Sequence, residues 1–184
     1  IEFDPVAGLR IGAAVNMNAM ARHAAVLAHY PLLAEAANSV ASYQLRTRAT
    51  MGGNLCNASP AADTAPAALV LDATLVTWGV DGERMIPSQD FFVSPGKNAL
   101  HPGEFVTRID FPLPPVGWNG CYRKLGRNAE GDLAIVGVAA MGYPDVTLSS
   151  GYRFRIGLAS VAPTPVLVPK VEQILAQSAV TDAL

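Results

Sequence analysis

The chain has 184 residues, of which 51% are hydrophobic and 15% charged, and its formal net charge is −2. This length suits one ordinary domain or two small ones with a real apolar core. The near-neutral balance gives no sign of the basic surface that nucleic-acid or anionic-membrane binding requires. The longest uncharged apolar run, at 133–143, is too short to span a bilayer. We therefore expect a soluble protein with neither a nucleic-acid nor a membrane partner.

Cysteine and histidine usage argues against a metal site. Cys56 and Cys121 lie far apart and form no CxxC pair, while His23, His29 and His101 lack metal-ligand spacing. We predict no bound metal, no disulfide framework and reduced thiols, which favours the cytoplasm.

The first forty residues predict a strand followed by two packed helices. Residues 9–13 indicate the strand, Asn18 can cap the first helix, and Pro31 suits the first turn of the second. The apolar stripes are Met20, Ala24 and Leu27 in the first helix and Leu32, Leu33, Ala36 and Val40 in the second. We expect both stripes to lie in the core.

Residues 50–63 form the least ordinary stretch, TMGGNLCNASPAAD. We expect a loop, since little in it could pack inside a strand or helix. Adjacent glycines can present successive backbone N–H groups as a concave nest for an anion. An ordinary turn explains the same residues, so chemistry leaves both interpretations open. An Ala-rich helix follows, starting at Ser59–Pro60 or at Asp63.

The remainder of the first half predicts extended structure. Two strand-like runs flank Asp81–Gly82, a pair typical of a type I′ hairpin turn. Residues 105–111 predict another strand, with alternate residues on one face. The proline-rich segment 112–118 breaks regular structure, so we place a domain boundary there. The alternating positions of that strand are Phe105, Thr107, Ile109 and Phe111.

Beyond the boundary the pattern predicts a small antiparallel sheet. Three strand-like runs, CYRKLGR, LAIVGVAAMGY and YRFRIGLASVA, precede a helix from about Pro169 to Gln177. Such a sheet leaves an apolar face that needs further cover. The chain also starts at Ile1 directly in a strand-like pattern, so we expect both ends to be incomplete.

Common nucleotide and hydrolase motifs do not fit. The Gly-Gly stretch is followed by no Gly-Lys-Ser/Thr, matches no GxGxxG fingerprint after a strand, and no serine lies in a GxSxG elbow. A P-loop nucleotidase, a Rossmann dehydrogenase and a triad hydrolase are all disfavoured.

The order of motifs resembles the FAD-binding subunit of the molybdenum hydroxylases, such as carbon monoxide dehydrogenase and xanthine dehydrogenase. The segments are LRIGA, YQLRTRATMGGNLCNASPAADTAPAAL, LDATL, DFFVSPGKNALHPGEFV and YRKLGRNAEGDLAIVGVAA. The resemblance implies an α+β fold in two parts. Residues 1–113 would be the larger second part of a vanillyl-alcohol-oxidase (PCMH)-type FAD domain. Residues 119–184 would be a truncated carbon monoxide dehydrogenase flavoprotein C-terminal-like domain, a three-stranded sheet with a helix.

The resemblance also implies a role in electron transfer. A molybdopterin subunit would oxidise the substrate, and two iron–sulfur clusters would pass electrons to FAD, which reduces NAD, oxygen or another acceptor. The implied partners are the iron–sulfur and molybdopterin subunits. No side chain of this chain would act as a catalytic group.

Site residues carry over from the resemblance one at a time. The second pyrophosphate loop would place Thr50, Gly52, Gly53 and Asn54 along the FAD diphosphate, with Asn57 beside the cofactor. Asp63 would bind a hydroxyl of the sugar or ribitol part. Leu100 would approach the isoalloxazine with its backbone. Val40 would contact the flavin, or be a core residue of its helix; Lys124 would lie near the ring, or be a solvated strand lysine.

Two departures from the family pattern qualify these expectations. The first pyrophosphate loop, an AGG-type run, and the C-terminal helical extension are both missing from the sequence. We therefore expect this chain alone to bind FAD weakly or not at all. The alternative function is a non-catalytic interaction scaffold that descends from the family and binds no FAD.

Overall fold

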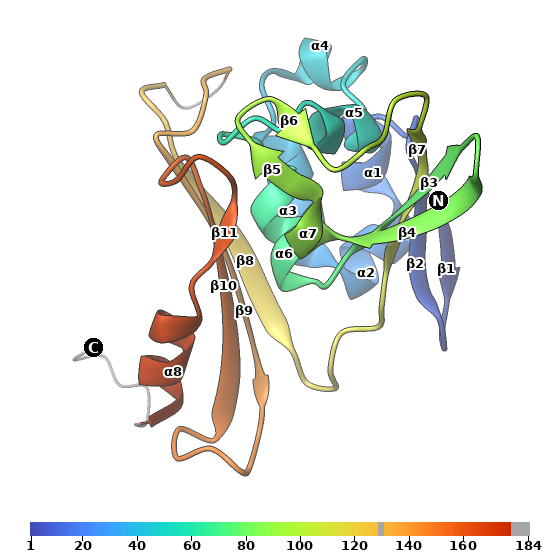
Figure 1. Cartoon of the computed structure of the whole chain (residues 1–184). Coiled ribbons are helices and arrows are strands. Elements are labelled where there is room, and N and C mark those ends of the chain that lie inside the picture. Colours follow the sequence, from blue (N-terminus) through green and yellow to red (C-terminus); the bar gives the residue numbers. More distant parts are fainter. Residues whose placement is uncertain (129–130, 178–184) are drawn as a thin grey trace.

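The computed structural model describes residues 1–128 and 131–177, and within them two main antiparallel sheets enclose a group of helices (Figure 1). The first sheet has the strand order β1-β2-β7-β3-β4. Its strands are β1 (Glu2–Asp4), β2 (Gly8–Gly12), β7 (Phe105–Phe111), β3 (Thr74–Gly79) and β4 (Gly82–Pro87). The predicted strands at 9–13, 105–111 and on both sides of the hairpin are thus confirmed.

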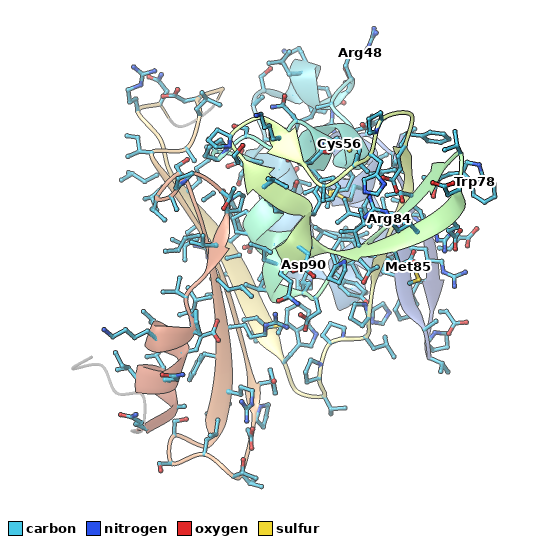
Figure 2. All side chains as sticks on the ribbon, in the orientation of Figure 1. Arg48, Cys56, Trp78, Arg84, Met85 and Asp90 are labelled. Carbon is cyan, nitrogen blue, oxygen red and sulfur yellow. The ribbon has the colours of Figure 1, made fainter. Side chains whose placement is uncertain are left out.

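The inner face of the first sheet is apolar and fully covered. Leu9 pairs with Phe111, and Ile109 pairs with both Ile11 and Leu75, so these side chains lie in register on one face. All five are buried in the core. The opposite face is partly exposed: Val76 is buried there, but Trp78 and Met85 project from it with more than half of their surface exposed (Figure 2).

A β-bulge changes the expected alternation of β7. Val76 pairs with Arg108, but the next residue, Thr77, pairs with Val106, so one residue of β7 is left over between them. The extra residue reverses the side-chain direction along the rest of the strand. Phe105 is consequently exposed and Val106 buried, contrary to the prediction that Phe105 shares a face with Ile109.

The β3–β4 hairpin forms as predicted, but its turn is shifted. Gly79 pairs with Gly82, so the two turn residues are Val80 and Asp81 rather than Asp81–Gly82. Among residues 79–82 only Gly82 has a positive φ, +96°. A type I′ turn requires positive φ at both central residues, which the β-branched Val80 resists. The glycine instead takes the positive φ just after the turn.

The predicted first helix is divided in two. Helix α1 (Met17–Arg22) and helix α2 (Ala24–His29) meet at His23, whose backbone is extended. The N-cap of α1 is Asn16, whose side chain accepts a hydrogen bond from the Ala19 N–H, so the prediction of Asn18 as cap was wrong. Asn18 lies inside the helix and is buried, and the predicted apolar Leu27 is half exposed.

Among the next helices, α3 (Pro31–Ser39) packs on the second sheet, whereas α5 (Met51–Cys56) and α7 (Ser88–Phe91) pack on the first. Helix α3 begins at the predicted proline and buries its apolar stripe. The remaining elements before β7 are α4 (Tyr43–Arg46), α6 (Thr64–Val70), β5 (Phe92–Ser94) and β6 (Lys97–Asn98). Helix α6 starts after Asp63, which decides between the two predicted starts.

The second sheet contains the three predicted strands and one more. Its order is β11-β10-β9-β8. The strands are β8 (Asn119–Leu125), β9 (Val136–Pro144), β10 (Tyr152–Ala159) and the two-residue β11 (Val166–Leu167), which the sequence pattern did not indicate. The predicted final helix, α8 (Pro169–Gln177), packs along β10.

Helices α3 and α6 lie between the two sheets (Figure 1). Tyr122, Ala139 and Met141 of the second sheet belong to the same buried cluster as the inner face of the first. One core therefore extends through the described chain, and the helices supply the cover that the second sheet needs on this face. The proposed division at 113 and 119 falls in the link between the sheets, where the Tyr30 hydroxyl donates to the Pro112 carbonyl at 3.0 Å.

Within residues 1–128 and 131–177, none of the helices combines the length and the apolar character that crossing a membrane would take.

Candidate functional site

The TMGGNLC segment is a helix, not the loop that we expected. Thr50 is the N-cap of α5, and its hydroxyl oxygen accepts a hydrogen bond of 3.1 Å from the Gly53 N–H. The N–H groups of Met51 and Gly52 donate to the carbonyls of Val15 and Ala13, each at 3.0 Å. A strong cap and two anchoring bonds offset the low helix propensity of the two glycines. The backbone of this turn is therefore already hydrogen-bonded and is not an open nest.

The two glycines have different surroundings. Gly52 is buried, and a Cβ there would lie 2.7 Å from the Cβ of Ala13. Gly53 is exposed, and a Cβ at that position would meet only the Thr50 hydroxyl, at 2.9 Å. Gly52 thus lets α5 pack against the end of β2. Gly53 leaves the exposed side of the helix without a side chain at that position.

Four of the predicted cofactor contacts share one side of α5. Thr50, Gly53, Asn54 and Asn57 follow each other at spacings of three, one and three residues, which places them on one helix face. Asn54 Oδ1 accepts a hydrogen bond of 2.6 Å from the Thr64 hydroxyl. That bond fixes the amide and directs its Nδ2 donor away from α6. The face is polar and built from small side chains.

Leu100 is brought beside this helix by Asn98. Asn98 Nδ2 donates to the Cys56 carbonyl at 2.7 Å, and its Oδ1 accepts from the Leu100 N–H at 3.0 Å. Leu100 and the first turn of α5 line one open cavity of about 440 Å³, and Cys56 also lines it. Sequence reasoning missed Asn98, although an asparagine two residues before Leu100 is the kind of side chain that ties a loop to its own backbone.

Glu104 fixes the other end of the Leu100 loop. Its carboxylate accepts hydrogen bonds from Arg84 Nε at 2.9 Å, from Arg84 Nη2 at 2.6 Å and from the His101 N–H at 2.8 Å, as well as from the Thr77 hydroxyl. Hydrogen bonding from Arg84 lowers the pKa of Glu104 to about 2. Arg84 also donates to the Ala99 carbonyl at 2.8 Å. This ion pair holds 99–104 against the β3–β4 hairpin and was not predicted.

The predicted residues Asp63 and Lys124 meet in a second cluster. Lys124 Nζ donates to Asp63 Oδ2 and to the Ser39 carbonyl, both at 2.9 Å. The Tyr122 hydroxyl donates to Asp63 Oδ1 at 2.7 Å. Burial raises the pKa of the Asp63 carboxyl above its usual range, against the opposing effect of Tyr122 and Lys124. Asp63 stands at the N-cap position of α6 but makes no capping bond, because both oxygens face β8.

Val40, which directly follows Ser39 in the sequence, lies in the core. Its side chain is buried, and its carbonyl accepts a hydrogen bond of 2.9 Å from Arg46 Nη1. The position agrees with the core alternative for Val40. Lys124, by contrast, is an ion-paired residue with only 15% of its side chain exposed, so it is not a solvated strand lysine.

The family follows from a comparison with known proteins. The profile described as "FAD binding domain in molybdopterin dehydrogenase" matches residues 2–114. The chain belongs to this family. Its membership accounts for the order of motifs around α5 and the Leu100 loop.

Relatives of this flavoprotein family align over most of the chain. The xanthine dehydrogenase FAD-binding subunit of Escherichia coli O157:H7 is 35% identical over 166 residues, covering 90% of this chain and 56% of that protein. The carbon monoxide dehydrogenase medium chain of Afipia carboxidovorans is 31% identical over 171 residues, covering 92% and 58%. The chain thus spans less than two thirds of the length of these relatives.

Solved structures confirm the fold. Carbon monoxide dehydrogenase from Hydrogenophaga pseudoflava matches with a TM-score of 0.87 and 32% identity, over 95% of this chain and 60% of that one. Quinoline 2-oxidoreductase from Pseudomonas putida 86 matches with a TM-score of 0.87 and 25% identity, over 99% and 62%. The described chain therefore has the flavoprotein fold that the motif order predicted.

Proposed function

We propose that this chain is the FAD-binding part of a molybdopterin-dependent oxidoreductase and that it transfers electrons without touching the substrate. The observation that carries the proposal is the polar face of α5, formed by Thr50, Gly53, Asn54 and Asn57, in a member of this FAD-binding family. Of this face, Thr50 and Gly53 line the same open cavity as Leu100.

The side chains of this face suit the diphosphate of FAD. Because the first N–H groups of α5 are already paired, the donors would be the Thr50 hydroxyl and Asn54 Nδ2. The missing Cβ of Gly53 would allow the diphosphate to approach closely. Bound FAD would supply the redox chemistry, whereas the chain would bind and orient it. Gly52 would contribute indirectly, by seating α5 against Ala13.

The other predicted contacts would serve the rest of the cofactor. Asp63 retains lone pairs that could accept a hydrogen bond from a sugar or ribitol hydroxyl, and Asn57 offers an exposed amide. Leu100 would approach the isoalloxazine with its backbone, and Val40 would remain a core residue. The Lys124 ammonium would stabilise negative charge on the reduced ring.

We propose that residues 1–184 by themselves hold FAD weakly. Two side-chain donors on α5 are few for a dianionic diphosphate when the neighbouring backbone donors are paired. The scaffold alternative, in which no FAD binds, predicts that even the full-length protein is colourless.

The proposed electron path runs from iron–sulfur clusters through FAD to NAD, oxygen or another acceptor. The names of two relatives, a carbon monoxide dehydrogenase medium chain and a 6-hydroxypseudooxynicotine dehydrogenase complex subunit, support the presence of other subunits. We propose an iron–sulfur subunit and a molybdopterin subunit as the partners. The free thiols of Cys56 and Cys121 support a location in the reducing cytoplasm.

Replacing Asn54 in the full-length protein tests this function. Asn54→Asp keeps the size and the bond from Thr64 but puts a carboxylate beside the diphosphate, so FAD affinity should fall about tenfold or more. Asn119→Asp makes the same change at the exposed start of β8, where the Asn119 side chain accepts a hydrogen bond from the Gly120 N–H, and should leave affinity unchanged. The measurement is flavin absorbance retained after purification and after titration with FAD. Equal retention in the two variants would contradict the proposed site, and a wild-type protein that takes up no FAD would support the scaffold.

A further inference from the structure

Tyr122 and Lys124 act on Asp63 from the same face of β8. They are two residues apart in the strand, so their side chains point to the same side of the sheet. Tyr122 holds one carboxylate oxygen at 2.7 Å and Lys124 holds the other at 2.9 Å. The result is a linear chain of hydrogen bonds from the tyrosine hydroxyl through the carboxylate to the ammonium.

These three hydrogen-bonded side chains are buried, so their stability depends on good hydrogen-bond geometry. Only 7% of the Asp63 side chain and 15% of the Lys124 side chain are exposed, and 2% of Tyr122. A buried ion pair is tolerated when further hydrogen bonds satisfy its remaining atoms. Burial also raises the pKa of Tyr122, so its hydroxyl remains a donor throughout the physiological range.

The neighbouring strand makes room for the hydroxyl. Gly137 of β9 lies diagonally across from Tyr122, and a Cβ there would clash directly with the Tyr122 hydroxyl oxygen. A glycine inside a strand weakens it and often marks the close approach of another group. Gly137 and Tyr122 thus form a fitted pair that directs the hydroxyl at Asp63.

Lys124 and Tyr122 both line a cavity beside this cluster. The cavity, of about 410 Å³, is lined by Ser39, Arg46 and Lys124 among others. The Ser39 carbonyl fixes the ammonium from the helix side, so Asp63 and Ser39 together set where its charge sits. The hydrogen bonds of the described residues join Tyr122 to Lys124 through Asp63.

We propose that Tyr122 is a positioning residue that fixes the Lys124 ammonium through Asp63 and thereby tunes the midpoint potential of the bound flavin. The effect on potential rests on the proposed function, whereas the effect on Lys124 does not. Gly137 belongs to the same device, because it gives the hydroxyl its space.

The first test needs no cofactor. The full-length protein is treated with an amine-acetylating reagent, and mass spectrometry follows Lys124, with the exposed Lys97 and Lys170 as internal references. Tyr122→Phe removes only the hydroxyl and should raise the relative rate at Lys124 about fivefold, the factor that corresponds to one hydrogen bond. Tyr152→Phe, at the exposed far end of β10, is the matched control and should change nothing. An unchanged rate at Lys124 would overturn the proposal.

Gly137→Ala is a second, independent variant. It displaces the hydroxyl without removing it, and so should raise the rate at Lys124 as well. Should Tyr122→Phe fail to fold, Gly137→Ala decides the question.

The second test uses the flavin-loaded protein. Tyr122→Phe should shift the midpoint potential in the same direction as Lys124→Met, and should add no shift when Lys124 is already Met. An equal shift in both backgrounds would show a general structural effect and overturn the role in tuning. A protein that takes up no FAD refutes the proposed function instead, and the acetylation rates then decide the positioning of Lys124 alone.

Discussion

Gly137 and Tyr122, on adjacent strands, are mutually dependent: the hydroxyl of Tyr122 occupies the space where a Cβ of residue 137 would be. Tyr122 pairs with Ala139, and Gly137 pairs with Lys124, so the contact is diagonal across the strands. Two residues in contact should show non-additive effects on stability.

The Gly137–Tyr122 contact predicts a rescue. Gly137→Ala alone should lower the free energy of unfolding by roughly 1–3 kcal/mol, the usual cost of overpacking. In the Tyr122→Phe background the same change should cost clearly less, because the clashing oxygen is absent. Urea denaturation of the four proteins measures the coupling, and additive losses would contradict the contact.

The two glycines of α5 should respond differently to the same change. Gly52→Ala places a Cβ 2.7 Å from the Ala13 Cβ and 2.9 Å from its carbonyl oxygen, so α5 must move away from β2. We expect a loss of roughly 1–3 kcal/mol in the free energy of unfolding. Gly53→Ala meets only the capping hydroxyl and gains helix propensity, so its net effect should be smaller. Thermal or urea unfolding measures the difference between the variants. Similar losses of unfolding free energy in both would contradict the prediction.

The bulkier Gly53→Val variant separates binding from folding. The larger side chain stands on the polar face of α5, where the diphosphate is proposed to lie. We expect FAD retention by the full-length protein to be lost while the fold remains. Retained flavin absorbance together with a native circular dichroism spectrum would place the diphosphate elsewhere.

Glu104 should make stability depend on acid pH. The bonds from Arg84 lower the pKa of its carboxyl from an ordinary 4.5 to about 2. A depressed pKa adds stability above the unfolded value, and that stability is lost as pH falls from about 4.5 towards 2. The destabilisation caused by Glu104→Gln should therefore be largest near neutral pH and shrink below pH 4.5. Urea midpoints across this range measure it.

Glu83→Gln is the control for Glu104. Glu83 is also an acid of the first sheet, but its side chain is 46% exposed and its bond to Arg108 is 3.2 Å. Pairs of this kind contribute at most about 1 kcal/mol. A pH dependence equal to that of Glu104→Gln would contradict the assignment of the acid-dependent stability to the Glu104–Arg84 pair.

The cap of α1 gives a further prediction about stability. Asn16→Ala removes the acceptor for the Ala19 N–H and should cost about 1 kcal/mol. Asn18→Ala should cost at least as much, because buried Asn18 donates to the Tyr43 carbonyl at 2.9 Å and accepts from Arg46. The Asn18 side chain thus links α1 to α4 by hydrogen bonds. An effect of Asn18→Ala well below that of Asn16→Ala would contradict that link.

Most of the strands could be predicted because their signal is local. Alternation and turn residues are properties of a few neighbours, and they located β7, the β3–β4 hairpin and the three long strands of the second sheet. The exposure of Phe105 could not be predicted in this way. It depends on a bulge whose extra residue is defined by the pairing of β7 with β3, a strand far away in sequence.

The helix at 51–56 could not be predicted for a related reason. Its glycines and asparagine disfavour a helix, but the N–H groups of Met51 and Gly52 bond to carbonyls near β2, which no local pattern reveals. Resemblance to the family found Asp63 and Lys124, which the structure brings together. It did not indicate Tyr122, Asn98 or Glu104, because their roles consist of contacts with residues far along the chain.

Two glutamates accept strand N–H groups of the second sheet, one on the edge strand β8 and one on β10 just beyond its short pairing with β11. Glu35 of α3 accepts the Tyr122 N–H of β8 at 2.7 Å, and Glu172 of α8 accepts the Ile156 N–H of β10 at 2.8 Å. Each carboxylate takes a backbone donor that would otherwise pair with a further strand. Open strand edges recruit other chains and start aggregation. Through these glutamates, α3 and α8 therefore also hinder the addition of a further strand. A variant that lacks either glutamate should self-associate under conditions in which it is still folded.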